Sequence, residues 1–155
     1  MVTKTNAMRR LDALKIPYKE YEYFHSLSGI EVATELGENP KQVFKTLLTQ
    51  AGPGLYYVFM LPVVCELDLK KAAVAVGKKA LCMVKSKDLS GICGYVHGGC
   101  SPIGMKKNFV TTIDESAKNF DSIIFSGGRI GQQIETTLEG LAKAVDYKFA
   151  DIVQN

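Results

Sequence analysis

Residues 43–61 limit the possible fold more than any other part of the chain. Two apolar and β-branched runs, Val43–Thr49 and Leu55–Leu61, are separated by the turn sequence Gly52-Pro53-Gly54. This pattern predicts a β-hairpin, whose two strands must be antiparallel. An antiparallel pair argues against a purely parallel, doubly wound sheet. We therefore expect a mixed α/β fold in which short helices surround a barrel-like mixed sheet.

The remaining apolar patterns predict short helices and short strands. Helical spacing or capping residues predict helices at 5–15, 29–36, 69–76 and 138–144, with shorter ones near 86–89 and 114–118. Apolar or β-branched runs predict strands at 18–23, 80–84, 109–113 and 122–125. Ser28, Asp68 and Thr137 are the expected N-caps of three of the helices.

The length of 155 residues fits one domain, so we expect residues 1–155 to form a single unit. The longest apolar run, 55–65, is shorter than the roughly 20 residues that a membrane helix needs. Residues 1–10 are polar and basic, unlike a signal peptide, and a cytoplasmic protein without a membrane partner is expected. The four cysteines form no C-x-x-C pair, and His25 and His97 lie far apart, so we predict no disulfide, metal or cofactor.

Lys45 is the first candidate for chemistry. In a strand it shares one face with two apolar residues, Val43 and Leu47. A lysine between apolar neighbours is costly to bury without a partner, and such a lysine commonly faces an anion or a cleft. The alternative is an edge strand from which the side chain reaches solvent. This pattern leaves both interpretations open.

Two glycine-rich segments are the next candidates. Residues 94–104 contain four glycines, which let backbone amides approach an oxyanion or a phosphate, although a tight structural turn is equally compatible. The turn 126–131 follows an expected strand and is either a ligand rim or a plain connection. Neither segment has the spacing of a P-loop or a dinucleotide-binding motif. Ser126 lacks a G-x-S-x-G context, so we expect it to form hydrogen bonds rather than attack a substrate.

His97 and Cys100 both lie in the first glycine-rich segment. No acidic residue stands near His97 in the sequence, so we interpret it as a loop residue rather than a catalytic base. We interpret Cys100 as a buried apolar residue rather than a nucleophile.

The charge of the chain is unevenly distributed. The net charge is +3, but residues 70–107 contain eight lysines and a single acid, Asp88. This segment carries a charge of about +7, which leaves about −4 for the rest. The pattern indicates either a face that meets an anion or ordinary solvated lysines.

Five segments occur in a fixed order along the chain. They are NPKQVFKTL (39–47), ELDLKK (66–71), GGCSPIG (98–104), SGG (126–128) and KFADI (148–152). Together they resemble the YbaK/EbsC family, also called the bacterial prolyl-tRNA synthetase associated domain. Within this family the chain is most similar to the free-standing Cys-tRNA(Pro) deacylases, which hydrolyse cysteine wrongly attached to proline tRNA.

The resemblance assigns roles to the candidate lysine and to the first glycine-rich segment. It implies that Lys45, followed by Thr46, holds the 3′-terminal adenosine or the aminoacyl ester. It implies that Gly98 and Gly99 present their amides to the ester carbonyl. Lys45, Gly98 and Gly99 would be the catalytic residues of the site, and Thr46 would bind the substrate.

Other substrate-binding residues follow from the same resemblance. Ser126, Tyr95 and Tyr23 match pocket positions of the family and would line one cleft. Gln133 stands where related deacylases commonly carry an aspartate. Any polar contact made at that position is therefore neutral in this protein.

The implied reaction is trans-editing hydrolysis of mischarged Cys-tRNA(Pro), in which the cysteine thiol of the substrate attacks its own ester. The sequence offers no convincing Ser-His-Asp or Cys-His set, in agreement with this mechanism. Two alternatives remain: an Ala-tRNA(Pro) deacylase of the same fold that activates water, and a non-catalytic protein that binds aminoacyl-tRNA or nucleotides.

The implied partner is the acceptor end of an aminoacyl-tRNA, with prolyl-tRNA synthetase lending tRNA selectivity. Lys70, Lys71, Lys106 and Lys107 flank the first glycine-rich segment in the sequence. We expect these four lysines to contact tRNA phosphates, which would make binding sensitive to salt.

Overall fold

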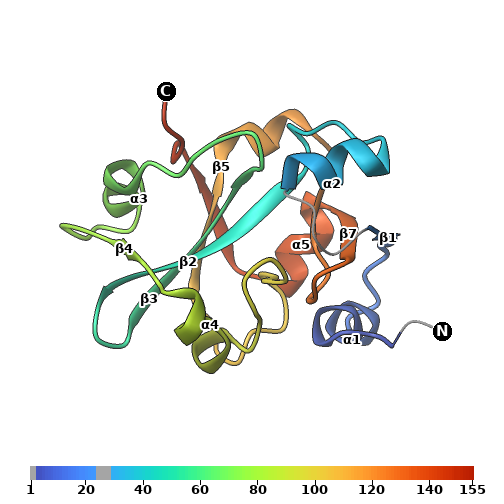
Figure 1. Ribbon diagram of the computed structural model, residues 1–155, viewed down its shortest axis with the longest axis horizontal. Helices are drawn as coiled ribbons and strands as arrows, with labels where there is room; N and C mark the ends of the chain where they lie inside the picture. The colour runs from blue at the N-terminus through green and yellow to red at the C-terminus, as the bar shows by residue number, and fades with distance from the viewer. Residues whose placement is uncertain (1–2, 24–28) are drawn as a thin grey trace.

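The computed structural model describes residues 3–23 and 29–155, and its centre is the β-hairpin (Figure 1). Strands β2 (Phe44–Gly52) and β3 (Leu55–Pro62) are antiparallel, with Phe44 opposite Pro62 at their open end. Gly54 in the turn has a φ of 74°, a left-handed conformation that favours glycine. The hairpin predicted from the sequence is therefore confirmed.

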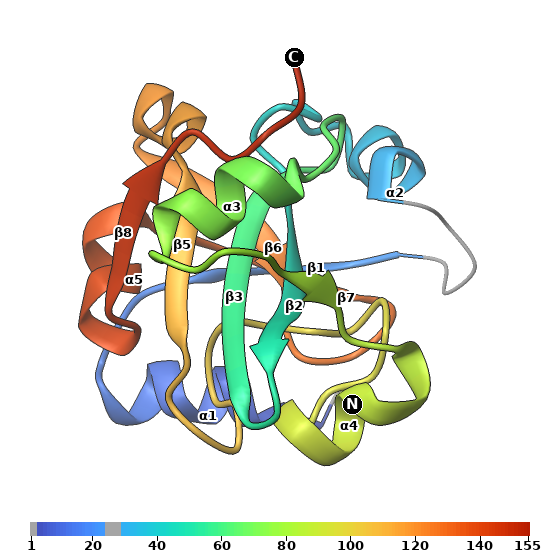
Figure 2. The ribbon, with the colours of Figure 1, turned by 90° about the vertical axis from the view of Figure 1, so that its left-hand side faces the viewer.

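The hairpin forms the middle of a five-stranded sheet with the order β4-β2-β3-β5-β8. The two-residue strand β4 (Cys82–Met83) is antiparallel to β2, whereas β5 (Val110–Asp114) and β8 (Tyr147–Ala150) continue the sheet with parallel pairs. Helix α3 (Leu69–Ala75) lies across one face of this sheet (Figure 2).

A second sheet has three strands in the order β1-β7-β6, all antiparallel. These strands are β1 (Lys19–Glu22), β6 (Ser122–Ser126) and β7 (Gln132–Thr137). Among the described residues, one parallel β-bridge, Val43 to Ile124, links the two sheets. The strands therefore form two sheets joined at one point and do not close into a barrel.

Short helices surround the sheets. Besides α3, they are α1 (Asn6–Ala13), α2 (Gly29–Leu36), α4 (Ser86–Cys93), the 3-10 helix η1 (Glu115–Asn119) and α5 (Leu138–Ala144). Asp68 caps α3 by accepting from the backbone N–H groups of Lys70 and Lys71, and Thr137 caps α5 by accepting from Gly140. The two caps expected from the sequence are thereby confirmed.

The main hydrophobic core lies where α1 and α5 pack against both sheets. Met8 of α1, Phe44 of β2, Phe125 of β6 and Leu141 of α5 are all buried in it. Because both sheets contribute to this core, the end of β6 is held firmly beside the start of β2.

Strand β2 has an open edge beside the junction of the two sheets. On that side β4 pairs only with Thr49 and Gln50, and flanking hydrogen bonds run from Ile124 N–H to the Gln42 carbonyl and from Val84 N–H to the Leu48 carbonyl. The edge between these two bonds has no neighbouring strand among the described residues. This gap is where the candidate site lies.

Residues 151–155 are bound to the loop between β3 and α3. Asp68 N–H donates to the Ile152 carbonyl at 2.8 Å, and Gln154 N–H donates to the Glu66 carbonyl at 2.9 Å. The Nζ atom of Lys71 contacts both carboxylate oxygens of Asp151, at 3.1 and 3.2 Å. The segment therefore fixes the backbone at Glu66.

The mixed α/β fold predicted from the sequence is confirmed, but two strands escaped prediction. These are β7 and β8, of which β7 carries the polar residues Gln132, Gln133 and Glu135. Helix α4 extends beyond the predicted residues 86–89. The expected cap Ser28 and the residue His25 lie outside the described residues.

Candidate functional site

A cavity of about 410 Å³ lies at the open edge of β2, where the two sheets meet. Five of the predicted site residues line it: Lys45, Thr46, Gly98, Ser126 and Gln133. They come from β2, from the loop after α4, from the end of β6 and from the start of β7. The fold thus brings together residues that are up to 88 positions apart in the sequence.

Lys45 enters the cavity from β2, where it pairs with Leu61 of β3. Its side chain is 27% exposed, and its Nζ atom lies 3.9 Å from Oε2 of Glu66, whose side chain is 78% exposed. An ion pair this long and this exposed contributes little to stability. The positive charge of Lys45 is therefore available to a ligand in the cavity.

Two buried polar atoms among the residues that line the cavity have no hydrogen-bond partner in the described structure. They are Oγ1 of Thr46 and Oε1 of Gln133, and the Gln133 residue is only 8% exposed. A buried polar atom left unpaired costs about 1–3 kcal/mol. A ligand that bonds to both atoms would recover this cost, so the cavity is suited to a polar ligand.

Ser126 ends β6 and lies opposite Gln133 of β7 in the sheet register. Its Oγ atom accepts a hydrogen bond from Gly128 N–H at 3.1 Å and so holds the following glycine turn. The Ser126 hydroxyl can still donate its own hydrogen into the cavity. This arrangement agrees with the predicted hydrogen-bonding role.

The two glycines of the predicted amide pair differ in position. Gly98 lines the cavity with a φ of 85°, and its N–H has no hydrogen-bond partner among the described residues. Gly99 is buried, and its N–H donates to the Val96 carbonyl at 3.0 Å. A Cβ on Gly99 would lie 3.0 Å from the Arg129 backbone. Gly98 therefore lines the cavity with an N–H that is unbonded within the described structure, whereas Gly99 shapes the loop.

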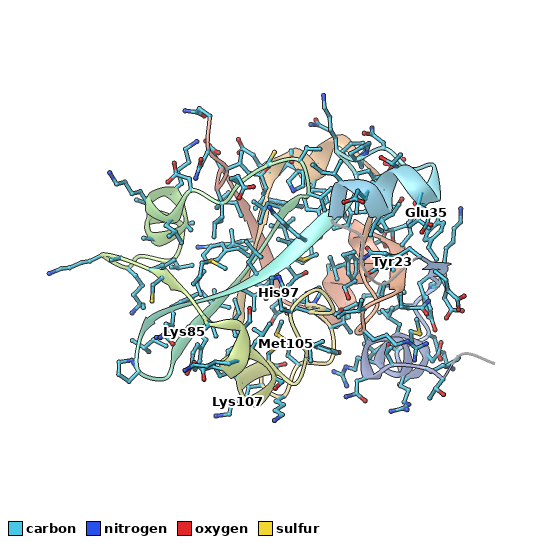
Figure 3. The ribbon with its side chains drawn as sticks, in the orientation of Figure 1. Tyr23, Glu35, Lys85, His97, Met105 and Lys107 are labelled. Atoms are coloured by element: carbon cyan, nitrogen blue, oxygen red, sulfur yellow. The ribbon has the colours of Figure 1, made fainter. Side chains whose placement is uncertain are left out.

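Neither predicted tyrosine lines the cavity. Tyr95 is buried, and its hydroxyl donates to the Ile103 carbonyl at 2.5 Å. Burial raises the pKa of Tyr95, so this hydroxyl remains protonated and ties the glycine-rich loop together. Tyr23 follows β1, where its N–H donates to the Gly131 carbonyl, and Figure 3 shows it apart from His97.

His97 and Cys100 complete the loop side of the cavity. The neighbouring buried thiol of Cys93, together with burial, raises the pKa of Cys100. A raised pKa keeps the thiol protonated and unreactive at neutral pH. No group of three His, Cys, Asp or Glu side chains in residues 3–23 and 29–155 is placed to hold a metal ion.

The amino-acid sequence is similar to those of known proteins. Residues 27–144 match the family described as the aminoacyl-tRNA editing domain. The chain belongs to this family. A relative from Enterococcus faecalis, named as a Cys-tRNA(Pro)/Cys-tRNA(Cys) deacylase, EbsC, is 45% identical over 152 residues, which cover 96% of this chain and 93% of the relative. The family predicted from the sequence motifs is therefore confirmed.

Solved structures agree with the fold of this editing domain. A structure described as a trans-editing enzyme for prolyl tRNA synthetase matches with a TM-score of 0.83 at 22% identity, over 99% of this chain and 100% of that chain. A protein described as hypothetical matches with a TM-score of 0.87 at 20% identity, over 97% of this chain and 100% of that chain. These similarities show that the fold is shared.

None of the four lysines expected to meet tRNA lines the cavity of the editing domain. Lys71 is bound to residues 151–155, and the Nζ atom of Lys106 donates to the Gly91 carbonyl in the last turns of α4. Lys107 lines a different cavity, and Lys70 is exposed on α3. The structure gives two of these lysines contacts within the protein.

Sequence reasoning missed one wall of the cavity. The segment from β4 to α4 contributes four lining residues: Met83, Val84, Ser86 and Leu89. The short strand at 80–84 was predicted, but its pairing with Thr49 of β2 joins residues far apart in the chain. No local pattern in the sequence reveals such a pairing.

The helices of this editing domain are short. No helix in the described part of the editing domain is long and apolar enough to cross a bilayer.

Proposed function

We propose that this editing domain is an aminoacyl-tRNA deacylase that removes cysteine from mischarged Cys-tRNA(Pro) in trans. The observation that carries the proposal is the cavity beside Lys45, whose lining residues include two, Thr46 and Gln133, that each carry a buried polar atom without a partner in the described structure. The family and the relative named as a Cys-tRNA(Pro)/Cys-tRNA(Cys) deacylase support the same reaction.

In the proposed reaction the substrate supplies the nucleophile. The cysteinyl sulfur attacks the ester carbonyl carbon, the bond from this carbon to the ribose oxygen breaks, and the thiol proton passes to that oxygen. The products are a tRNA with a free terminal hydroxyl and a cysteine thiolactone, which water then opens. An alanyl or prolyl ester has no thiol and is not released by this route.

The residues that line the cavity support a reaction in which the substrate supplies the nucleophile. Two serines and a cysteine line it, but no hydrogen bond joins His97 to Ser86, Ser126 or Cys100 in the described structure. A protein nucleophile needs such a neighbouring base or a lowered pKa, and Cys100 has a raised one.

Four polar groups of the cavity have a proposed partner in the substrate. Lys45 attracts the terminal phosphate or the ester, and Gly98 N–H donates to the carbonyl oxygen as negative charge develops there. Oε1 of Gln133 accepts from the α-ammonium group, and the Thr46 hydroxyl bonds to the ribose. These contacts hold the thiol against the carbonyl, so orientation provides most of the acceleration.

We further propose that residues 1–155 act as one editing unit in the cytoplasm and bind the acceptor end of the tRNA. A cavity of about 410 Å³ suits a ligand the size of an aminoacyl-adenosine, not a whole tRNA. Selectivity for proline tRNA would therefore come from a partner, for which prolyl-tRNA synthetase is the candidate.

The test is deacylation of purified Cys-tRNA(Pro), Ala-tRNA(Pro) and Pro-tRNA(Pro). We expect the protein to release cysteine and to spare proline, and the Lys45→Ala variant to lose the activity. If neither cysteine nor alanine is released faster than in buffer alone, the proposed enzymatic activity is overturned and the protein is a binding protein. Release of alanine as fast as cysteine would support water attack in place of the thiol mechanism.

A second experiment tests the origin of the nucleophile. Replacing the esterified cysteine by serine should slow release sharply, because a hydroxyl attacks an ester far less readily than a thiol. The variants Cys100→Ala and His97→Ala should retain activity on the cysteinyl ester. A loss of activity in either variant comparable to that of Lys45→Ala would assign the nucleophile or base to the protein.

A further inference from the structure

The segment from β4 to α4 separates the candidate cavity from a second hollow of about 380 Å³. Met83 and Val84 line both spaces. Figure 3 shows Lys85 toward the turn of the β2–β3 hairpin and His97 nearer the centre of the molecule. A chain that leaves the candidate cavity across Met83 would therefore enter the second hollow directly.

The second hollow combines a fixed aromatic ring with positive charge. Tyr56 of β3 lines it, and the ring packs edge-on against Phe109 with centroids 5.8 Å apart. Lys85 and Lys87 also line the hollow, and both are exposed without an ion pair among the described residues. Asp88 is the acidic residue that lines the hollow, and Gln50 of β2 adds an amide.

The start of helix α4 adds to the positive potential between the two spaces. Lys85 occupies the N-cap position and provides no side-chain cap, so the first N–H groups of α4 are not bound by a capping side chain. Ser86, the first residue of α4, lines the candidate cavity. The helix dipole and both lysines therefore act at the passage between the two spaces, where Asp88 in the first turn of α4 is the one opposing charge among the lining residues.

We propose that this second hollow binds the nucleotides that precede the terminal adenosine in the single-stranded 3′ end of the tRNA. The proposal rests on the proposed function, in which the terminal aminoacyl-adenosine occupies the candidate cavity. Single-stranded nucleic acids are bound by aromatic rings that contact the bases and by basic side chains that follow the phosphates. Tyr56 provides the ring, and Lys85 and Lys87 provide the charge.

This assignment differs from the lysines expected from the sequence. Lys71 and Lys106 are occupied by contacts within the protein, and Lys107 lies at another cavity. Lys85 and Lys87, in contrast, are adjacent in sequence to Val84 and Ser86, which line the candidate cavity. The positive charge that would bind the phosphates of the 3′ end is therefore assigned to Lys85 and Lys87 of the β4–α4 segment.

The first test measures binding without catalysis. A short fluorescent RNA that ends in C-C-A is titrated at several salt concentrations against the wild type and against the K85A/K87A variant. Losing two phosphate contacts should reduce the slope of log affinity against log salt by about 1.4 and weaken binding about tenfold at low salt. The matched control is K78A/K79A, which removes two exposed lysines that line none of the cavities described here.

Equal slopes for the wild type and K85A/K87A would overturn the second site, as would no binding by the wild type at any salt concentration. An equal loss in K78A/K79A would also overturn it, because the effect would then reflect total charge. These outcomes do not depend on deacylation, so they are distinct from failure of the proposed function.

The second test compares two substrates. The K85A/K87A variant should lower kcat/KM for a cysteinyl oligonucleotide about tenfold more than for the cysteinyl ester of adenosine alone. Equal losses on the two substrates would overturn the proposal. If the wild type hydrolyses neither substrate, the proposed function fails, and the binding measurement still decides the second site.

Discussion

Two cavities share the loop that follows α4, and they differ in what lines them. The candidate cavity, of about 410 Å³, is bounded by Gly98 and Cys100 of this loop. A larger cavity, of about 490 Å³, is bounded by later loop residues, including Lys107, and by the end of α5. The larger cavity has three basic side chains, from Arg10, Lys107 and Lys143, but no buried polar atom without a partner among its described lining residues.

This difference teaches that size and charge do not identify the site. Lys143 lies in the last turn of α5, where a cation is stabilised by the carbonyl end of the helix dipole. The charge of Lys143 therefore has a structural explanation. The unpaired atoms of Thr46 and Gln133 have no such explanation within the described protein, so they distinguish the candidate cavity from the larger one.

The largest expected effect on kcat/KM comes from replacing Lys45, and Lys143 of the larger cavity provides the comparison. The Lys45→Ala variant should lower kcat/KM for Cys-tRNA(Pro) about 100-fold, because it removes a charge at the reacting ester. The Lys143→Ala variant removes a charge from the larger cavity and should change kcat/KM by less than about twofold. Equal losses in the two variants would mean that both cavities serve the reaction.

A smaller effect is expected from the loop that both cavities share. Gly99→Ala should lower the free energy of unfolding by about 1–3 kcal/mol, because the new Cβ would lie 3.0 Å from the backbone of Arg129. The control, Gly91→Ala in α4, meets no atom within 4 Å and should raise it by up to about 1 kcal/mol. Chemical denaturation measures both, and a neutral Gly99→Ala would show that the loop moves freely.

The smallest expected effect, that of Thr46→Val, separates a role in substrate binding from a role in stability most clearly. Thr46→Val removes a buried hydroxyl that has no partner, so it should raise the free energy of unfolding by about 1 kcal/mol while raising KM about fivefold. Thr112→Val removes another unpaired buried hydroxyl, in β5 away from the cavity, and should give the same stabilisation with KM unchanged. If KM changes equally in both variants, the Thr46 hydroxyl does not contact the substrate.

The hairpin and Lys45 were predictable because their signals are local. Two apolar runs around Gly52-Pro53-Gly54 specify the hairpin without reference to the rest of the chain. The strand pattern around Lys45 left a cleft and a solvent-facing edge both open. In the structure the two are combined, since Lys45 lines a cavity at an open strand edge.

Strand β7 was not predictable from its own residues. Gln132 and Gln133 have low strand propensity, and their burial depends on pairing with β1 and β6. The position of Gln133 in the cavity follows from this pairing with Ser126, not from any local pattern. The wall from β4 to α4 escaped prediction for the same reason.

The anchoring of residues 151–155 has a practical consequence for anyone who handles this protein. Their hydrogen bonds to Asp68 and Glu66 connect the end of the chain to the carboxylate beside Lys45. An affinity tag or fusion partner attached at Asn155 would follow directly on this anchored segment, so we expect it to disturb the backbone at Glu66. Assays of activity should therefore compare a protein extended at Asn155 with one that carries no extension there.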